Sequence, residues 1–256
     1  TSAVQKLQSA AVGMAAIPAG TALPKEPAAA FFLSCTETRQ SDYQRFLEEL
    51  QAVITAAGND AGAQRAAVQE RLGAVTPAPE VLQRMLDRRT KLRAPEMPVE
   101  GVNWFEAAAC AQWFHLSLPT KAEWALAAFG DGKSHAFPWG NEWKDDDSAR
   151  NISTSAAVAA NSGGLSWRGS GSDAIHHLAG NVAEWLAGEP TASEGLLAGG
   201  RYNDSRKEAR LRATGEDFHK ASLLRDLPGF GFRMVLRPRQ FLASEFANGQ
   251  YPTEAR

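Results

Sequence analysis

The chain has 256 residues, a formal net charge of −2 and a hydrophobic content of 44%. This length fits one large domain, or one domain with an insertion, and the apolar content is enough to bury a core. Because the charges nearly balance, the composition excludes a broad basic surface for nucleic acid. No apolar run approaches the roughly 18 residues that a membrane span needs, so we expect none.

The cysteines are few, and the chain begins with Thr. Cys35 and Cys110 are the two cysteines, and they form no CxxC motif that would predict a local metal site. Two buried free thiols, a single disulfide in an oxidising compartment and a pair of catalytic thiols remain as alternatives. Thr at position 1 fits a chain whose leader has been removed.

The first predicted elements are short strands and a helix. Residues 15–20 predict a strand that ends in a turn, and residues 30–35 predict a second, apolar strand. Residues 41–44 have a capping-box pattern at the start of a helix. Helical spacing then relates four apolar side chains, Tyr43, Phe46, Leu47 and Leu50.

Residues 51–95 predict a helical insertion. Ala, Gln, Arg and Glu dominate there, which is typical of two or three amphipathic helices. One helix has a modest apolar stripe from Val81, Met85 and Leu92. The expected breaks are at Gly58, Gly73, Pro77 and Pro79. We expect the insertion to pack on the main domain, and a partner surface is the alternative.

Two further helices have clear start signals. Asn103 and Glu106 have the spacing of an N-cap and its N3 partner, and Thr120 and Glu123 form a full capping box. Gly130 is the expected C-cap of the second helix. Residues 131–171 then show little regular patterning, and such a long loop needs ions, aromatic clamps or polar networks to be ordered. Residues 239–256 are expected to form a C-terminal tail.

Six motifs occur in one order. They are residues 101–107 (Gly-Val-Asn-Trp-Phe-Glu-Ala), 118–124 (Leu-Pro-Thr-Lys-Ala-Glu-Trp), 137–142 (Phe-Pro-Trp-Gly-Asn-Glu), 178–185 (Leu-Ala-Gly-Asn-Val-Ala-Glu-Trp), 197–202 (Leu-Ala-Gly-Gly-Arg-Tyr) and 231–233 (Gly-Phe-Arg). In this order they resemble the motifs of the formylglycine-generating enzyme (sulfatase-modifying factor) family. The resemblance implies one α+β domain over residues 1–256. Its expected fold is C-type-lectin-like, of the formylglycine-generating-enzyme type, and loop-rich with the helical insertion.

Tryptophan is abundant, with seven residues in the chain. Four lie in the motifs, namely Trp104, Trp124, Trp139 and Trp185. Because an indole buries a large area and needs a partner for its N–H, we expect these rings mainly to anchor loops. Trp185 is the candidate for lining a pocket.

The resemblance implies structural calcium, which backbone carbonyls and carboxylates of such loops can bind. It places one site at Asn151 and Ile152, and another at Gly180, Val182 and Glu184. His177 stands where an Asn-type ligand is usual in the second site, and imidazole is a poor calcium ligand. A purely hydrogen-bonded Glu184 is the alternative.

The family's oxidase binds Cu(I) through two cysteines after a Gly-Gly-Ser-Tyr motif, and soft thiolates suit that ion. Asp204 and Ala209 occupy those positions here, so copper is not expected. Met234 likewise replaces a cysteine that often pairs with the position of Cys110. The five histidines form no iron-binding face, and no flavin or nicotinamide fingerprint is present.

The remaining residues of the pocket region are polar and charged. The planar donors of Arg suit an anionic or catechol-like ligand, and a carboxylate beside them can act as a general base. The catalytic candidates are Asp204, Glu208, Glu216 and His219. The substrate-binding candidates are Trp185, Arg201, Arg206, Arg212 and Arg225.

The absence of thiols resembles the PvdO-type branch of the family. That resemblance implies a periplasmic oxidoreductase that completes the chromophore of a pyoverdine-type siderophore precursor. A non-catalytic ligand-binding module and an envelope-assembly module are the alternatives. The enzyme predicts a pocket closed by Trp185 and Arg212, with a carboxylate of raised pKa. A display module predicts a flat, exposed surface over 201–217, and an assembly module predicts an apolar patch on 51–93.

Overall fold

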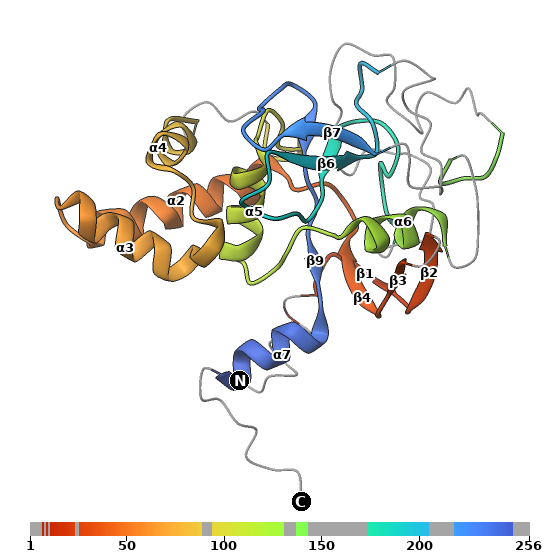
Figure 1. Ribbon diagram of the computed structural model, residues 1–256, viewed down its shortest axis with the longest axis horizontal. Coiled ribbons are helices and arrows are strands. Elements are labelled where there is room, and N and C mark those ends of the chain that lie inside the picture. The colour runs from red at the N-terminus through yellow and green to blue at the C-terminus, as the bar shows by residue number, and fades with distance from the viewer. Residues whose placement is uncertain are drawn as a thin grey trace, which may run out of the picture.

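The computed structural model describes residues 7, 9, 11–23, 26–88, 94–130, 137–142, 174–204 and 218–247. The helices α2 (Gln40–Ala56), α3 (Ala61–Leu72) and α4 (Pro79–Arg88) lie on one side of the molecule and the strands on the other (Figure 1). Between them is α5 (Trp104–Trp113), and α6 (Lys121–Phe129) lies beside the strands. The last helix, α7 (Pro238–Ala247), leads away from the body after β9 (Val235–Leu236). The mixture of helices and short strands confirms the predicted α+β class.

The first sheet joins the two ends of the chain. Its order is β1 (Met14–Ile17), β4 (Phe31–Ser34) and β9, all antiparallel. A hairpin of β2 (Gly20–Leu23) and β3 (Glu26–Ala28) lies between β1 and β4 in the chain. The predicted strand that ends in a turn within 15–20 is confirmed: β1 ends at Ile17, because Pro18 has no N–H to continue the ladder, and β2 begins at Gly20.

The second sheet has the order β7 (His219–Ser222), β6 (Glu194–Ala198), β5 (Ala183–Trp185) and β8 (Phe230–Gly231). β5 and β8 are parallel, and the other pairs are antiparallel. At Gly231 the backbone packs so closely that an added Cβ would lie 2.5 Å from the Val99 carbonyl oxygen. This sheet therefore requires glycine at the final motif.

The insertion packs on the main domain, as predicted. α2 (Gln40–Ala56), α3 (Ala61–Leu72), the 3₁₀ helix η1 (Gly73–Val75) and α4 (Pro79–Arg88) follow one another, with breaks at Gly58 and Gly73. Val68 and Met85 are fully buried in the same cluster as Phe232. Among the described residues, the exposed large apolar side chains are Val12 and Leu224. Neither lies in the insertion, so its described part lacks the apolar patch that an assembly module predicts.

The start of α2 differs from the prediction. The helix begins at Gln40, and its N-cap, Arg39, makes no side-chain capping bond. The Gln40 and Ser41 N–H groups instead donate to the carbonyls of Met97 and Pro95, at 2.8 and 3.1 Å. The capping box predicted at Ser41 is therefore wrong, because backbone from a distant segment satisfies the free N–H groups.

The capping boxes of α5 and α6 (Lys121–Phe129) are confirmed. Asn103 accepts from the Glu106 N–H, and the Glu106 carboxylate accepts from the Asn103 N–H at 2.7 Å. Thr120 and Glu123 make the same reciprocal pair, and α6 ends at Gly130, whose φ is 80°. These caps fix where two nearly fully buried helices enter the core.

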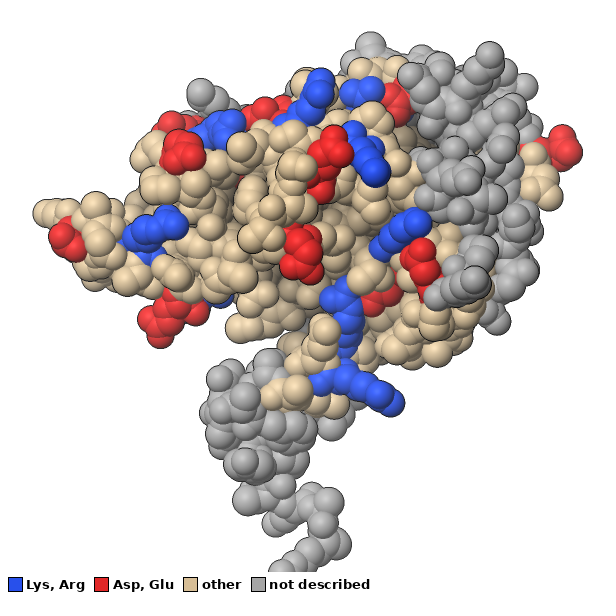
Figure 2. Space-filling model, viewed as in Figure 1, with Lys and Arg blue, Asp and Glu red and all other residues tan. Residues whose placement is uncertain are grey.

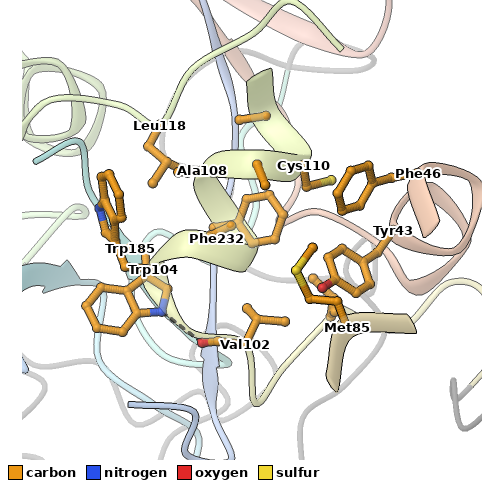
Figure 3. Close-up of a cluster of buried hydrophobic side chains, with 14 of the residues drawn as sticks. Tyr43, Phe46, Met85, Val102, Trp104, Ala108, Cys110, Leu118, Trp185 and Phe232 are labelled. Atoms are coloured by element: carbon orange, nitrogen blue, oxygen red, sulfur yellow. Dashed lines mark hydrogen bonds between the residues drawn. The ribbon is translucent and has the colours of Figure 1, made fainter. Parts of the chain in front are cut away.

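The main apolar cluster surrounds α5 (Figure 3). Phe46 from α2 and Met85 from α4 approach one side of this helix, and Trp104 and Trp185 lie on the other. Cys35 and Cys110 are both free and buried, which agrees with the first of the three alternatives for the cysteines.

No helix in the described ranges combines the length and apolar character needed to cross a membrane. On the face drawn in Figure 2, Lys and Arg alternate with Asp and Glu. This mixture agrees with the nearly balanced charge of the sequence.

Candidate functional site

The turn after β6 is fixed against the loop before β5. The N–H of Gly180 donates to the carbonyl of Gly199 at 2.7 Å, and the N–H of Tyr202 donates to that of Asn181 at 2.8 Å. Gly199 has a φ of 91°, a value that glycine adopts without strain. Two motifs that lie about 20 residues apart in the sequence are thereby held side by side.

Arg201 and Asp204 form a pair within this turn. The Asp204 carboxylate accepts from the backbone N–H of Arg201 at 2.8 Å and from its Nε at 2.9 Å. Arg201 Nη2 lies 2.7 Å from Asp204 Oδ1, and the two side chains are 28% and 12% exposed. Since a two-point ionic contact fixes the guanidinium plane, Arg201 has one orientation and is still partly open to solvent.

The ring of Phe230 contacts the side chains of both Arg201 and His219. Arg201 Cζ lies 5.6 Å from the centroid of the Phe230 ring, and the His219 ring meets it edge-on at 6.3 Å. Gly229 leaves room for the arginine stem, because a Cβ there would lie 3.0 Å from Arg201 Cδ. His219 is itself exposed on β7. We name this group the Arg201 surface and define it as Arg201, Asp204, His219, Gly229 and Phe230.

Trp185, which we predicted to line a pocket and bind substrate, lies in the core. Its side chain is fully buried, and its Nε1–H donates to the Val102 carbonyl at 2.9 Å (Figure 3). Its ring packs edge-on against Phe230, with centroids 5.6 Å apart. Trp185 therefore supports the Arg201 surface from the core side.

The other predicted site residues are divided between described and undescribed parts of the chain. Arg225 lies exposed on the turn after β7, and its backbone N–H donates to Ser222. Among the described residues, it makes no hydrogen bond or ion pair with the Arg201 surface. The candidates that lie outside the described residues are Arg206, Glu208, Arg212, Glu216, Asn151 and Ile152.

Glu184 and Arg233 form a second, fully buried pair. The Nε of Arg233 lies 2.8 Å from each Glu184 oxygen, and its Nη2 lies 2.6 Å from Oε1. The Nε1–H of Trp124 donates to Glu184 Oε2 at 2.8 Å. Arg233 also donates to the carbonyls of Ser34 and His176. The motifs at 118–124, 178–185 and 231–233 thus meet in one polar centre.

Glu37 is a buried carboxyl beside this centre, and the sequence did not single it out. It is 1% exposed and accepts from Asn181 Nδ2 at 3.1 Å and from the Val182 N–H at 3.4 Å. Burial raises the pKa of Glu37 well above its usual range, and nearby Glu184 adds to the rise although Arg233 opposes it. The one sequence signal for Glu37 is an acidic residue three positions after the end of an apolar strand.

The family model for the sulfatase-modifying factor enzyme 1-like domain matches residues 8–238. The chain belongs to this family. This match confirms the resemblance drawn from the six motifs.

Relatives of this sulfatase-modifying factor protein match over part of their length. Formylglycine-generating enzyme of Thermomonospora curvata is 34% identical over 112 residues, which are 36% of this chain and 34% of that protein. Inactive C-alpha-formylglycine-generating enzyme 2 of Bos taurus is 31% identical over 116 residues, and the match covers 39% of this chain and 35% of that protein. Hercynine oxygenase of Mycolicibacterium thermoresistibile is 31% identical over 105 residues, and the match covers 36% of this chain and 21% of that protein. The matches to the first two span about a third of each relative's length.

Solved structures show the same fold over most of the chain. Treponema denticola variable protein 1 superposes with a TM-score of 0.54 at 19% identity, over 88% of this chain and 95% of that one. PvdO from Pseudomonas aeruginosa superposes with a TM-score of 0.52 at 15% identity, over 88% of this chain and 94% of that one. At such identities the likeness defines the fold and leaves the chemistry to the residues of the site.

At the position where the oxidase's first thiolate is expected, this family member has Asp204, which Arg201 engages. A carboxylate in that pairing is not a soft ligand for copper. Ala209, at the second position, lies outside the described residues.

Glu184 does not fit the calcium site that the family implies. Both of its oxygens accept from Arg233 or Trp124, and the adjacent guanidinium carries the positive charge that a cation would supply. These contacts match the alternative of a hydrogen-bonded Glu184. Gly180 and Val182 belong to the loop that Gly199 and Glu37 anchor, and Asn151 and Ile152 stay a prediction.

Proposed function

We propose that this protein is a periplasmic tailoring protein, an oxidoreductase that completes the chromophore of a pyoverdine-type siderophore precursor. The observation that carries the proposal is the Arg201 surface, where a guanidinium is oriented by Asp204, stacked on Phe230 and left partly open. The fold likeness to PvdO and the relationship to hercynine oxygenase support a tailoring role.

In this proposal Arg201 orients the substrate. Arginine has five N–H donors, and Asp204 takes those of Nε and one on Nη2, so about three remain for a catechol or another anionic group. His219, exposed beside the same ring, accepts a proton, because Asp204 is already paired. The precursor loses two electrons and two protons as a single bond becomes double. Molecular oxygen takes both and becomes hydrogen peroxide.

The experiment is to incubate the purified protein with non-fluorescent precursor under oxygen and to follow chromophore absorbance and peroxide. We expect wild type to form both products in equal amounts. Arg201→Met should slow conversion by at least about tenfold. The variant loses hydrogen bonds to a charged group, each of which contributes about 1.5–3 kcal/mol, and about 1.4 kcal/mol corresponds to a factor of ten. Arg239→Met, an exposed change on α7, is the matched control. Absence of conversion by wild type, with or without added metal ions, would refute the catalytic proposal.

A ligand-binding module without chemistry is the second candidate. The burial of Trp185 favours it, because the aromatic wall that we expected to close a pocket faces the core instead. Saturable binding of the precursor without any conversion would establish this alternative. Fractionation of cells that produce the full-length protein tests the location, and we expect the periplasmic fraction to contain it.

A further inference from the structure

Glu100 is a buried residue whose carboxyl group contacts the Arg201 surface, and the sequence did not single it out. It is 8% exposed, and its Oε2 accepts from the backbone N–H of Gly229 at 2.7 Å. The two residues lie 129 positions apart in the sequence. A buried backbone N–H needs an acceptor, and a carboxylate is a strong one. Glu100 therefore holds one residue of the surface from a distant segment of the chain.

Gly229 is held at both of its backbone polar groups. Its N–H donates to Glu100, and its carbonyl accepts from the Ala183 N–H at 2.7 Å. Its φ of 81° lies in the left-handed region, which glycine adopts without strain. Because the two hydrogen bonds come from different segments, they fix where the Cα of Gly229 lies.

The side chain of Arg201 lies against Gly229. A Cβ built on this glycine would lie 3.0, 3.1 and 3.2 Å from Cδ, Cγ and Cβ of Arg201. Three successive atoms of the arginine stem therefore follow the glycine backbone. The next residue is Phe230, whose ring centroid lies 5.6 Å from Arg201 Cζ. The position of Gly229 thus sets the path of the stem, while Asp204 sets the plane of the guanidinium.

The helical insertion contacts both Glu100 and the turn before Gly229. Arg88, at the end of α4, donates from Nη1 to the Glu100 carbonyl at 3.3 Å. Arg84 of the same helix pairs with Asp226 at 3.2 Å, and these two side chains are 42% and 36% exposed. Since exposed ion pairs contribute little, the buried hydrogen bond of Glu100 is the stronger of these links to the Arg201 surface.

We propose that Glu100 is a positioning residue of the Arg201 surface. Through the Gly229 N–H it keeps the Arg201 guanidinium over Phe230, where an anionic or catechol group of the substrate binds. The consequence for turnover rests on the proposed function, whereas the placement of Arg201 does not. Glu100 acts as a hydrogen-bond acceptor, so Gln, whose amide oxygen also accepts, should replace it and Ala should not.

The side-chain Nε–H signal of Arg201 in a proton–nitrogen correlation spectrum of the full chain tests the placement. Arg201→Lys removes this signal and so assigns it. We expect Glu100→Ala to displace or broaden the signal and Glu100→Gln to leave it near its wild-type position. Glu96→Ala, at an exposed position of the same segment, is the matched control and should leave it unchanged. A signal that is unchanged in Glu100→Ala, or displaced equally in Glu96→Ala, overturns the proposal.

The KM for the siderophore precursor gives a second readout. Glu100→Ala should raise KM roughly threefold or more, and Glu100→Gln should stay close to wild type. In an Arg201→Met background the same alanine change should have no further effect on KM, because no guanidinium is left to position. An equal rise in both backgrounds would show that Glu100 supports only the fold, which contradicts the proposal.

Failure of the proposed function and failure of this inference give different results. If wild type converts no precursor, the proposed function fails, and the Arg201 signal alone decides the role of Glu100. Should Glu100→Ala not fold, Glu100→Asp takes its place, because a carboxylate one methylene shorter cannot keep the 2.7 Å contact unless Gly229 moves. We expect this variant to displace the Arg201 signal, and an unchanged signal would overturn the proposal.

Discussion

Two of the Arg–carboxylate pairs in the described part of the chain have nearly the same nitrogen–oxygen distance and opposite surroundings. Arg233 Nη2 lies 2.6 Å from Glu184 and Arg201 Nη2 lies 2.7 Å from Asp204. The first pair is 0% exposed on both sides, whereas the second is 28% and 12% exposed. Burial, rather than distance, therefore separates a pair that holds the fold from one that can meet a ligand.

The largest effect should follow from breaking the buried pair. Arg233→Met is expected to lower the free energy of unfolding by about 3–5 kcal/mol, because it leaves Glu184 buried without its counter-charge. Urea denaturation followed by circular dichroism measures this loss. Arg201→Met is the matched control, and we expect it to cost less than about 1 kcal/mol. Equal losses in both variants would contradict the comparison.

A third pair lies between these two and should give an intermediate loss. Arg237 and Glu123 are 20% and 9% exposed, with Arg237 Nη2 2.6 Å from Oε2. The same carboxylate also caps α6. Arg237→Met is expected to cost about 1–3 kcal/mol in the same denaturation experiment. If Arg237→Met lowered the free energy of unfolding as much as Arg233→Met does, burial would not determine how much each Arg–carboxylate pair contributes to stability.

The pH dependence of stability should reveal the titration of Glu37, the buried carboxyl beside the Arg233–Glu184 pair. Because burial raises its folded-state pKa, the folded protein keeps the proton that the unfolded chain releases above roughly pH 4.3. Stability is thus present below that pH and is lost as pH rises toward the folded pKa. Each unit of the rise corresponds to about 1.4 kcal/mol.

Glu37→Gln removes this titration, so its stability relative to wild type should increase as the pH rises above roughly 4.3 and level off once the pH exceeds the raised folded-state pKa. Thermal unfolding at several pH values measures the trend. Glu48→Gln, at an exposed position of α2, should track wild type throughout. A constant difference between Glu37→Gln and wild type would show that the carboxyl does not titrate over the pH values measured.

The smallest change in stability should come from the exposed pair itself. Asp204→Asn is expected to cost less than about 1 kcal/mol, yet it frees the Arg201 guanidinium from its fixed plane. If Arg201 orients the siderophore precursor, the variant should have a higher KM with little change in the unfolding midpoint. An unchanged KM would remove the orienting role from Asp204.

Short-range patterns predicted the helices well. The boxes at Asn103 and Thr120 each join residues three apart, so their physics is contained in the local sequence. The box predicted at Ser41 failed because backbone carbonyls more than 50 residues away took its place. A helix boundary can therefore be predicted from the sequence only where its capping partners are close in the sequence.

The site was harder to predict, because its contacts join distant segments. Glu184 has the sequence context of a loop ligand, and only Arg233, 49 residues further on, shows that it is neutralised in the core. Trp185 is an aromatic residue of the kind that often lines a pocket, but its Nε1–H donates to the Val102 carbonyl in the core. By contrast, the contact between Arg201 and Asp204 is local in the sequence, since both residues belong to the same turn.

The position of Arg233 also has a consequence for the order in which the protein can be built. Its guanidinium binds Ser34, His176 and Glu184, all of which are synthesised before it. Chains generally begin to fold from the N-terminus as they are made, but here the polar centre cannot form until Arg233 has been synthesised. Glu184 therefore waits for its counter-charge while 48 further residues are added after it.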